Sequence, residues 1–321
     1  MFKRTDLKFQ PVVFACSLVI MLSLVPAAAG DEDQDLPGPE KQRLKTKDGV
    51  VLVCDYYPGS NGKETVPILM VHGWEGVRGE FEKLARTLQR DFGHAVIVPD
   101  LRGHGDSVRY RKPNGKEGVI NPKRMNPRAL LEGMYQFDLE RVKKFLVRKN
   151  NEEELNIDLL CIVGVQMGAI VGMNFAVIDW NYPPLATGIK RGEDVKAFVL
   201  VSPIQAFKGV TMQGALKHPG VQKLSTMILV GNKDRKGLKQ ARQLNSSMKR
   251  FHLPVPGDSE EKTGTKSLFL VDFRTSLKGT KLLDAPVSKK KFGPHGWIAS
   301  FIQLRLQNKQ DEYPWRERYT K

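Results

Sequence analysis

The residue with the clearest chemical meaning in this chain is Gln166, which lies between Gly164 and Gly168. The run 159–163 before it reads as a buried strand, and the residues after Gly168 read as a helix. A serine held between two glycines at such a strand-to-helix turn is the nucleophile of a G-x-S-x-G elbow. A glutamine amide cannot be deprotonated near neutral pH and forms no acyl intermediate. The sequence therefore predicts the backbone of a nucleophile site without its nucleophile.

Other predicted strands also end in residues of the kind that builds enzyme sites. The segment 72–76 follows one buried strand, the loop 99–107 follows the next, and Asp234 follows a later strand. In a parallel sheet the carboxyl ends of the strands share one edge, and ligands bind there. We therefore expect these residues to lie with Gln166 at a single edge of one sheet.

The elements that must position these residues alternate between short apolar runs and amphipathic segments. This alternation predicts an α/β fold with a mostly parallel central sheet and helices on both faces. Asp48-Gly49 predicts an N-terminal antiparallel hairpin, and the short stretch between Val201 and Met227 leaves room for a small lid or none. The predicted strands are 43–47, 50–57, 68–71, 95–98, 159–163, 197–201, 227–230 and 268–273, and the predicted helices are 80–90, 126–145, 168–179, 236–250 and 298–306.

Taken in order, these segments resemble those of alpha/beta hydrolases, of the serine aminopeptidase-like and monoglyceride-lipase-like type. The segment 72–76 resembles the family's HG-x-x-G loop, and residues 100–107 resemble its D-x-R-G-x-G-x-S turn. Residues 164–168 resemble its nucleophile elbow, and residues 229–234 resemble the strand end that carries its catalytic acid. The resemblance covers residues 42–307 and implies an α/β-hydrolase fold.

The resemblance implies a position for each catalytic group of the family. Gln166 occupies the nucleophile position, and Asp234 occupies the acid position. Lys278 occupies the histidine position, because residues 277–283 match the family's H-G-x-x-L setting. His295, near the start of the closing helix, is the alternative base. With Lys278 at the histidine position, the family's triad would lack two of its three members.

The resemblance also implies an oxyanion hole formed by the backbone N–H groups of Trp74 and Met167. His72, Gly73 and Gly76 would shape the pocket loop around it. Backbone donors survive the loss of a side chain, so such a pocket could still receive a carbonyl or carboxylate oxygen.

The N-terminus reads as a targeting segment rather than as part of the fold. Residues 1–29 combine a basic start, an apolar stretch too short to span a bilayer comfortably and the small-residue site Ala27-Ala28-Ala29. We expect a signal peptide cleaved before Gly30 and a secreted or periplasmic protein, with an uncleaved anchor as the alternative. A flexible lead-in over 30–41 and a polar C-terminal tail over 308–321 complete the predicted organisation.

Composition limits the partners. The formal net charge of +16 favours loose association with anionic polymers or a membrane surface, and no motif indicates specific nucleic-acid binding. Cys54 and Cys161 lie in strand-like runs and are expected to be buried free thiols. No cysteine and histidine spacing indicates a metal site, and we expect no cofactor.

Three functions remain in view. The first is a secreted pseudoenzyme that keeps a pocket for a small acyl or carboxylate ligand, since loss of triad members removes most of the catalysis. The second is an active hydrolase of ester, amide or thioester bonds that uses His295 as base and water oriented by Gln166. The third, weaker alternative is a binder of acidic polymers through the basic surface. Only the second needs His295 to reach both a site water and Asp234.

Overall fold

The structure is a computed structural model that describes residues 38–112, 114–184, 190–252, 265–286 and 292–318. The chain divides into two units, Met1–Asp35 and Leu36–Lys321. The first unit lies outside the described residues, and so do the predicted signal peptide and most of the predicted lead-in. All that follows concerns the second unit.

One ten-stranded sheet organises the described part of the chain, in the order β12-β11-β8-β7-β3-β4-β2-β5-β6, with β1 paired to β2. The strands from β4 to β12 along this order are parallel, and β2 joins β4 in the antiparallel direction. The strands are β1 (Glu40–Lys45), β2 (Val50–Tyr57), β3 (Pro67–Val71), β4 (Ala95–Pro99), β5 (Arg109–Arg111), β6 (Glu117–Val119), β7 (Leu160–Val165), β8 (Val195–Val201), β9 (Ala206–Phe207), β10 (Val210–Thr211), β11 (Ser225–Gly231) and β12 (Leu268–Phe273).

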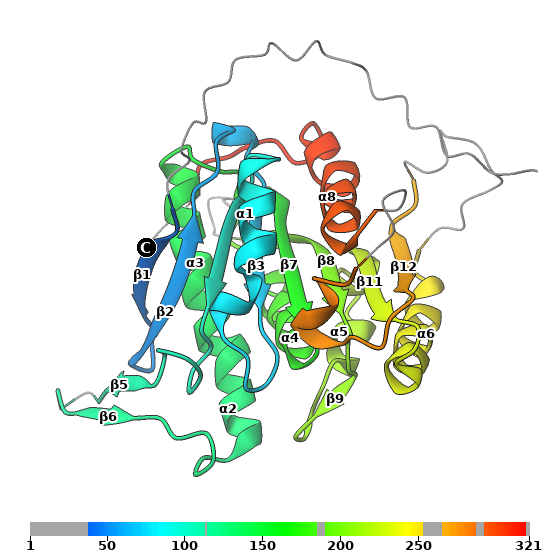
Figure 1. Cartoon of the computed structure of the whole chain (residues 1–321). Coiled ribbons are helices and arrows are strands. Elements are labelled where there is room, and N and C mark those ends of the chain that lie inside the picture. Colours follow the sequence, from blue (N-terminus) through cyan, green and yellow to red (C-terminus); the bar gives the residue numbers. More distant parts are fainter. Residues whose placement is uncertain (1–37, 113, 185–189, 253–264, 287–291, 319–321) are drawn as a thin grey trace, which may run out of the picture. The chain divides into compact units, whose positions relative to one another are not determined.

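Helices cover both faces of the sheet, as the alternation of the sequence predicts (Figure 1). One face packs against α1 and α8, and the other packs against α2 to α6. The α-helices are α1 (Glu82–Arg90), α2 (Pro127–Gly133), α3 (Leu139–Asn151), α4 (Met167–Trp180), α5 (Gln213–Lys217), α6 (Arg235–Lys249) and α8 (Pro294–Arg305). Short 3-10 helices include η2 (Arg78–Phe81), η5 (Val221–Lys223), η6 (Gly279–Leu282) and η7 (Gln307–Lys309).

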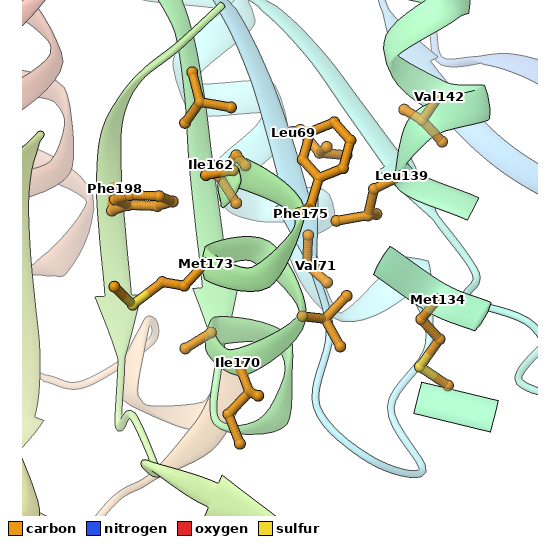
Figure 2. Close-up of a cluster of buried hydrophobic side chains, with 14 of the residues drawn as sticks. Leu69, Val71, Met134, Leu139, Val142, Ile162, Ile170, Met173, Phe175 and Phe198 are labelled. Atoms are coloured by element: carbon orange, nitrogen blue, oxygen red, sulfur yellow. The ribbon is translucent and has the colours of Figure 1, made fainter. Parts of the chain in front are cut away.

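The core on the α4 side is built from alternate residues of the central strands. Leu69 and Val71 of β3 and Ile162 of β7 meet Phe175 of α4 and Leu139 of α3 (Figure 2). The intervening residues of the same strands point to the α1 and α8 face, where Met70 and Val163 are buried as well. A central parallel strand is apolar on both sides for this reason.

The N-terminal hairpin is confirmed, with Leu44 opposite Leu52 in the antiparallel pair β1–β2. Cys54 and Cys161 are free and buried, as expected. The described residues contain no helix with enough length and apolar character to cross a membrane.

The predicted long helix over 126–145 is interrupted. A π-helical turn, η3 (Met134–Asp138), separates α2 from α3. The Asp138 carboxylate at the end of this turn accepts hydrogen bonds from the backbone N–H and the Nε of Arg102, both at 2.9 Å. A helical period alone cannot reveal such an interruption, because the partner, Arg102, comes from a distant loop.

The segment between β8 and β11 holds only the hairpin β9–β10, α5 and η5, which agrees with the predicted small lid. The C-terminal segment differs from the prediction. The residues after 307, predicted as a polar tail, pack on the domain as far as Arg318. The Trp315 indole donates to the Asn150 carbonyl at 3.2 Å, and the Asn151 amide donates to the Arg318 carbonyl.

Candidate functional site

Gln166 occupies a strained turn between β7 and α4. Its backbone has φ 49° and ψ −109°, a conformation that residues other than glycine rarely adopt. The flanking glycines are required by close contacts. A Cβ on Gly168 would lie 2.2 Å from the Val71 carbonyl oxygen, and a Cβ on Gly164 would lie 2.7 Å from the Cα of Ala169. The G-x-Q-x-G segment therefore keeps the tight geometry of a nucleophile elbow.

The side chain of Gln166 lies between two loops of the same sheet edge. A Cβ built on Gly73 would be 3.1 Å from Gln166 Oε1, and a Cβ built on Gly279 would be 3.4 Å from the same oxygen. Gly73 belongs to the loop after β3, and Gly279 follows β12. The amide is half-buried in this position. It can donate and accept hydrogen bonds there, but it supplies no nucleophile.

The loop after β3 is held by His72 underneath it. The His72 imidazole is fully buried; its Nδ1 donates to the Gly73 carbonyl at 2.7 Å, and its Nε2 accepts from the Leu101 N–H at 3.0 Å. Burial lowers the pKa of His72 to about 4, so the ring stays neutral and keeps both bonds. The Gly76 N–H closes the turn on the Gly73 carbonyl at 3.1 Å. His72, Gly73 and Gly76 thus act on the shape of the loop.

The backbone N–H groups of Trp74 and Met167 lie at this edge of the sheet. The Trp74 N–H makes no hydrogen bond within the described residues. Met167 is the first residue of α4, so its N–H belongs to the amides that have no partner inside the helix. The Trp74 ring is covered by the lid hairpin: Lys208 Nζ lies 3.7 Å from its centroid, and the Phe207 ring lies 5.5 Å away.

Lys278 and Asp234 lie on loops that meet at the same edge. The Lys233 N–H donates to the Thr275 carbonyl at 3.0 Å and so joins the loop after β11 to the loop after β12. Lys278 is exposed and directly precedes Gly279, the neighbour of Gln166. The Asp234 carboxylate caps α6 by accepting from the Gly237 N–H at 3.0 Å. No ion pair between Lys278 and Asp234 occurs in the described part of the chain.

His295 is not brought to Gln166. It lies in the first turn of α8, and its Nδ1 is 3.4 Å from Thr87 Oγ1 on α1. Burial lowers its pKa, and Asp284 and Lys83 are the charges that act on it. Within the described residues it has no hydrogen bond with Gln166 or Asp234.

Every histidine of the chain lies within the described residues. None of the six forms a hydrogen bond with Gln166 or Asp234. Only His104 joins His72 near the site; its Nδ1 donates to the Arg102 carbonyl at 3.0 Å, and its ring packs on Trp74. The six histidines are His72, His94, His104, His218, His252 and His295.

The structure adds residues that the sequence does not reveal as part of this edge. Ser202, which follows β8 with φ 46°, is buried, and its Oγ accepts from the Gly279 N–H at 3.1 Å. Thr280 Oγ1 donates to Glu80 at 2.6 Å. The Val201-Ser202-Pro203 strand end could have pointed to Ser202, whereas the contact of Thr280 with Glu80 spans 200 residues and leaves no local signal.

Five cavities of the structure lie away from Gln166. Five surface cavities lined by described residues have neither Gln166, Trp74 nor Met167 in their lining. The described residues also hold no cluster of three or more histidine, cysteine or acidic side chains that could bind a metal.

Solved structures with the same architecture include enzymes. An esterase from Pyrococcus furiosus is 15% identical, with a TM-score of 0.55 over 86% of this chain and 94% of that chain. An alpha/beta hydrolase from Novosphingobium aromaticivorans is 14% identical, with a TM-score of 0.52 over 83% and 99%. Esterase 2 from Thermogutta terrifontis, solved after phosphorylation by paraoxon, is 14% identical, with a TM-score of 0.51 over 86% and 95%. At these identities the likeness concerns the fold.

Sequence comparison supports the same assignment. No curated protein sequence matches the chain. A family model described as the alpha/beta hydrolase fold matches residues 66–232, which extend from the start of β3 past the elbow to the loop after β11. This match covers more than half of the chain. The chain therefore belongs to the alpha/beta hydrolase fold family.

Proposed function

We propose that this chain is a catalytically degenerate alpha/beta hydrolase that binds a small acyl or carboxylate group and forms no acyl intermediate. The observation that carries the proposal is the amide of Gln166, which lies between Gly73 and Gly279 at the nucleophile position. Nucleophilic catalysis at this turn needs a hydroxyl or thiol with an adjacent base. Gln166 supplies no hydroxyl or thiol, the nearest histidines hold loops, and His295 contacts Thr87.

The class of ligand follows from the hydrogen-bond donors and the cation at this edge of the sheet. The unpaired N–H group of Trp74 and the first amide of α4, at Met167, are donors of the kind that binds an oxyanion. Lys278 is an exposed cation on the adjoining loop and favours a negative ligand. Because none of the five cavities reaches Gln166, the proposal is confined to a small group rather than a bulky substrate.

Paraoxon gives a direct test of the chemistry, with Thermogutta terrifontis esterase 2 as the positive control. Mass spectrometry of the intact protein should show no phosphoryl adduct on this chain. Gln166→Ser alone should react slowly, because no histidine forms a hydrogen bond at this position to take the serine proton. Gln166→Ser with Lys278→His should react at least ten times faster than either single variant, with Gln166→Ala as the blank.

Two outcomes would overturn the proposal. An adduct on the natural chain would reveal another nucleophile at the site. Equal labelling of Gln166→Ser and the double variant would mean that a working base already exists. Adding His295→Gln to Gln166→Ser would then decide whether His295 is that base, as the active-hydrolase alternative requires.

The proposal includes export of the protein. It rests on residues 1–29, whose basic start, apolar stretch and Ala27-Ala28-Ala29 site fit a cleaved signal peptide. N-terminal sequencing of exported protein should begin at Gly30. Exported protein that still carries Met1 would contradict it.

A further inference from the structure

A cavity of about 330 Å³ lies at the sheet edge opposite Gln166. Its walls come from α3, from Arg318 and from four described residues between α4 and β8, which are Tyr182, Lys190, Arg191 and Asp194. Since α4 begins at the elbow and β8 begins after these four residues, this wall stands at the amino ends of the parallel strands. The volume is at the lower end of the range for small-molecule sites. The cavity is therefore separate from the site proposed above.

The base of this cavity is a buried network of ion pairs whose positive and negative charges cancel. Lys143 Nζ contacts the carboxylates of Asp179 and Asp194, the latter at 2.7 Å, and Arg318 pairs with Asp194 and, at 3.0 Å, with Asp158. Lys190, which also pairs with Asp158, brings the network to three cations and three carboxylates. Buried charges require such pairing, because desolvation is costly for each of them. These cations are therefore already satisfied without a ligand.

The charge at the rim of the cavity, which is formed by Glu140, Arg141, Lys144, Arg148 and Arg191, is not balanced. Four cations face one carboxylate, and that carboxylate, Glu140, lies 3.7 Å from the exposed Lys144. Arg141, Arg148 and Arg191 have no acidic partner in the described part of the chain. Arg141 donates only through Nε, to the Lys45 carbonyl at 2.9 Å. Burial first, and then the neighbouring Arg148, lower the pKa of Arg141, as expected for like charges held close together.

Two of these guanidinium groups lie over aromatic rings. The centre of Arg148 is 5.6 Å from the Phe145 ring, and that of Arg191 is 5.7 Å from the Tyr182 ring. Stacking on a ring restricts a guanidinium while its N–H groups stay open to a ligand. Tyr182 and Val147 also line the cavity and give it an apolar wall.

We infer that this cavity binds a small anion that carries at least two phosphate or sulfate groups. Three guanidinium groups without an acidic partner surround this cavity. A guanidinium group can contact a phosphate or sulfate group through two parallel hydrogen bonds. The neutral base leaves the excess positive charge at the rim, where the ligand would lie. The apolar wall of Tyr182 and Val147 would receive the organic part of the ligand.

Isothermal titration of the full mature chain with inorganic tripolyphosphate tests the inference. The natural chain should bind it saturably at one site. Replacing the three rim arginines together (Arg141→Gln, Arg148→Gln and Arg191→Gln) should weaken binding at least tenfold. Circular dichroism of this variant should show an intact fold, since two of the three side chains are exposed.

A matched control separates a site from overall charge. Lys236→Gln, Lys249→Gln and Arg250→Gln remove the same charge from exposed positions on or just after α6, away from the cavity. This control should bind tripolyphosphate within twofold of the natural chain. Equal weakening of the two triple variants would overturn the inference, because binding would then depend on net charge alone. Absence of saturable binding to the natural chain would overturn it as well.

A second arm identifies the source of the phosphate. Vesicles of phosphatidylcholine with phosphatidic acid are sedimented with the natural chain and with the rim variant. Cosedimentation that the rim variant loses would identify a lipid head group as the ligand. Tripolyphosphate binding without cosedimentation would identify a soluble phosphate compound. Cosedimentation that the rim variant retains would exclude the cavity as the lipid site.

Discussion

The elbow at Gln166 and the loop between β4 and β5 belong to one family pattern, but the side chains of the two regions differ in the contacts that they make. In the loop, the polar residues keep their partners: Asp100 accepts from the Arg78 N–H at 2.7 Å, Arg102 pairs with Asp138 at 2.7 Å, and Ser107 Oγ accepts from the Val53 N–H at 2.8 Å. At the elbow, close contacts require the two glycines, whereas the Gln166 side chain is a neutral, half-buried amide.

This difference shows which parts of the pattern the fold itself needs. The loop contacts bury charge and backbone, so their loss would destabilise the protein whatever its function. The Gln166 side chain carries no charge and lies half-buried between Gly73 and Gly279, so the architecture depends less on it. The comparison predicts that the two regions respond oppositely to mutation.

The largest effect is expected for Asp138→Ala. Arg102 is almost fully buried and would keep only the half-exposed Asp48 as an acidic partner. Leaving a buried cation with part of its pairing removed should lower the free energy of unfolding by about 3 to 5 kcal/mol. Gln166→Ala, the matched change at the elbow, should alter it by less than about 1 kcal/mol. Urea denaturation of both variants measures this, and similar losses would break the comparison.

The next effect concerns His72, which joins the two regions through the Gly73 carbonyl and the Leu101 N–H. Burial lowers its pKa to about 4, whereas an unfolded histidine titrates near 6.5. The unfolded chain therefore binds the proton first as pH falls, and stability is full above about 6.5. Between about pH 6.5 and 4 this group should cost about 3 kcal/mol of stability. His72→Gln should remove that share of the pH dependence in urea denaturation.

His94 provides the control for this measurement. Burial also lowers its pKa to about 4, and both of its ring nitrogens lack a hydrogen-bond partner among the described residues. His94→Gln should therefore remove a similar share of the pH dependence. At pH 8 it should leave the protein more stable than His72→Gln does, because no hydrogen bond between the two loops is lost. An unchanged slope in both variants would show that neither ring is held neutral.

Much of the fold could be predicted from the sequence, because it depends on local pattern. The run 268–273 is a strand with the predicted ends, and Asp48-Gly49 turns the predicted hairpin. The hairpin of β5 and β6 was not predicted, although Asn114-Gly115 between them is the kind of pair that marks such turns. The interruption of the long helix at η3 was not predicted, because it depends on Arg102 from another loop.

The candidate site was predictable to a smaller extent. The turn at Gln166 follows from two glycines between a strand and a helix, which are neighbours in sequence. The position of its side chain between Gly73 and Gly279 depends on loops from three strands, so no local pattern encodes it. The same holds for His295, because its place near the start of the closing helix gave no hint that it contacts Thr87.

The smallest expected effect on stability distinguishes the contribution of the elbow backbone from that of the Gln166 side chain. Gln166 has φ 49° and ψ −109°, a conformation that costs residues other than glycine about 1 to 3 kcal/mol. Gln166→Gly removes that strain but gives the unfolded chain more freedom, at a cost of about 0.5 to 1 kcal/mol. The variant should therefore be more stable than the natural chain by about 1 kcal/mol, whereas Gln166→Ala keeps the strain and should gain nothing. Urea denaturation of the two variants at pH 8, where His72 and His94 are neutral, measures the difference. A Gln166→Gly variant less stable than Gln166→Ala would mean that the turn at Gln166 is unstrained.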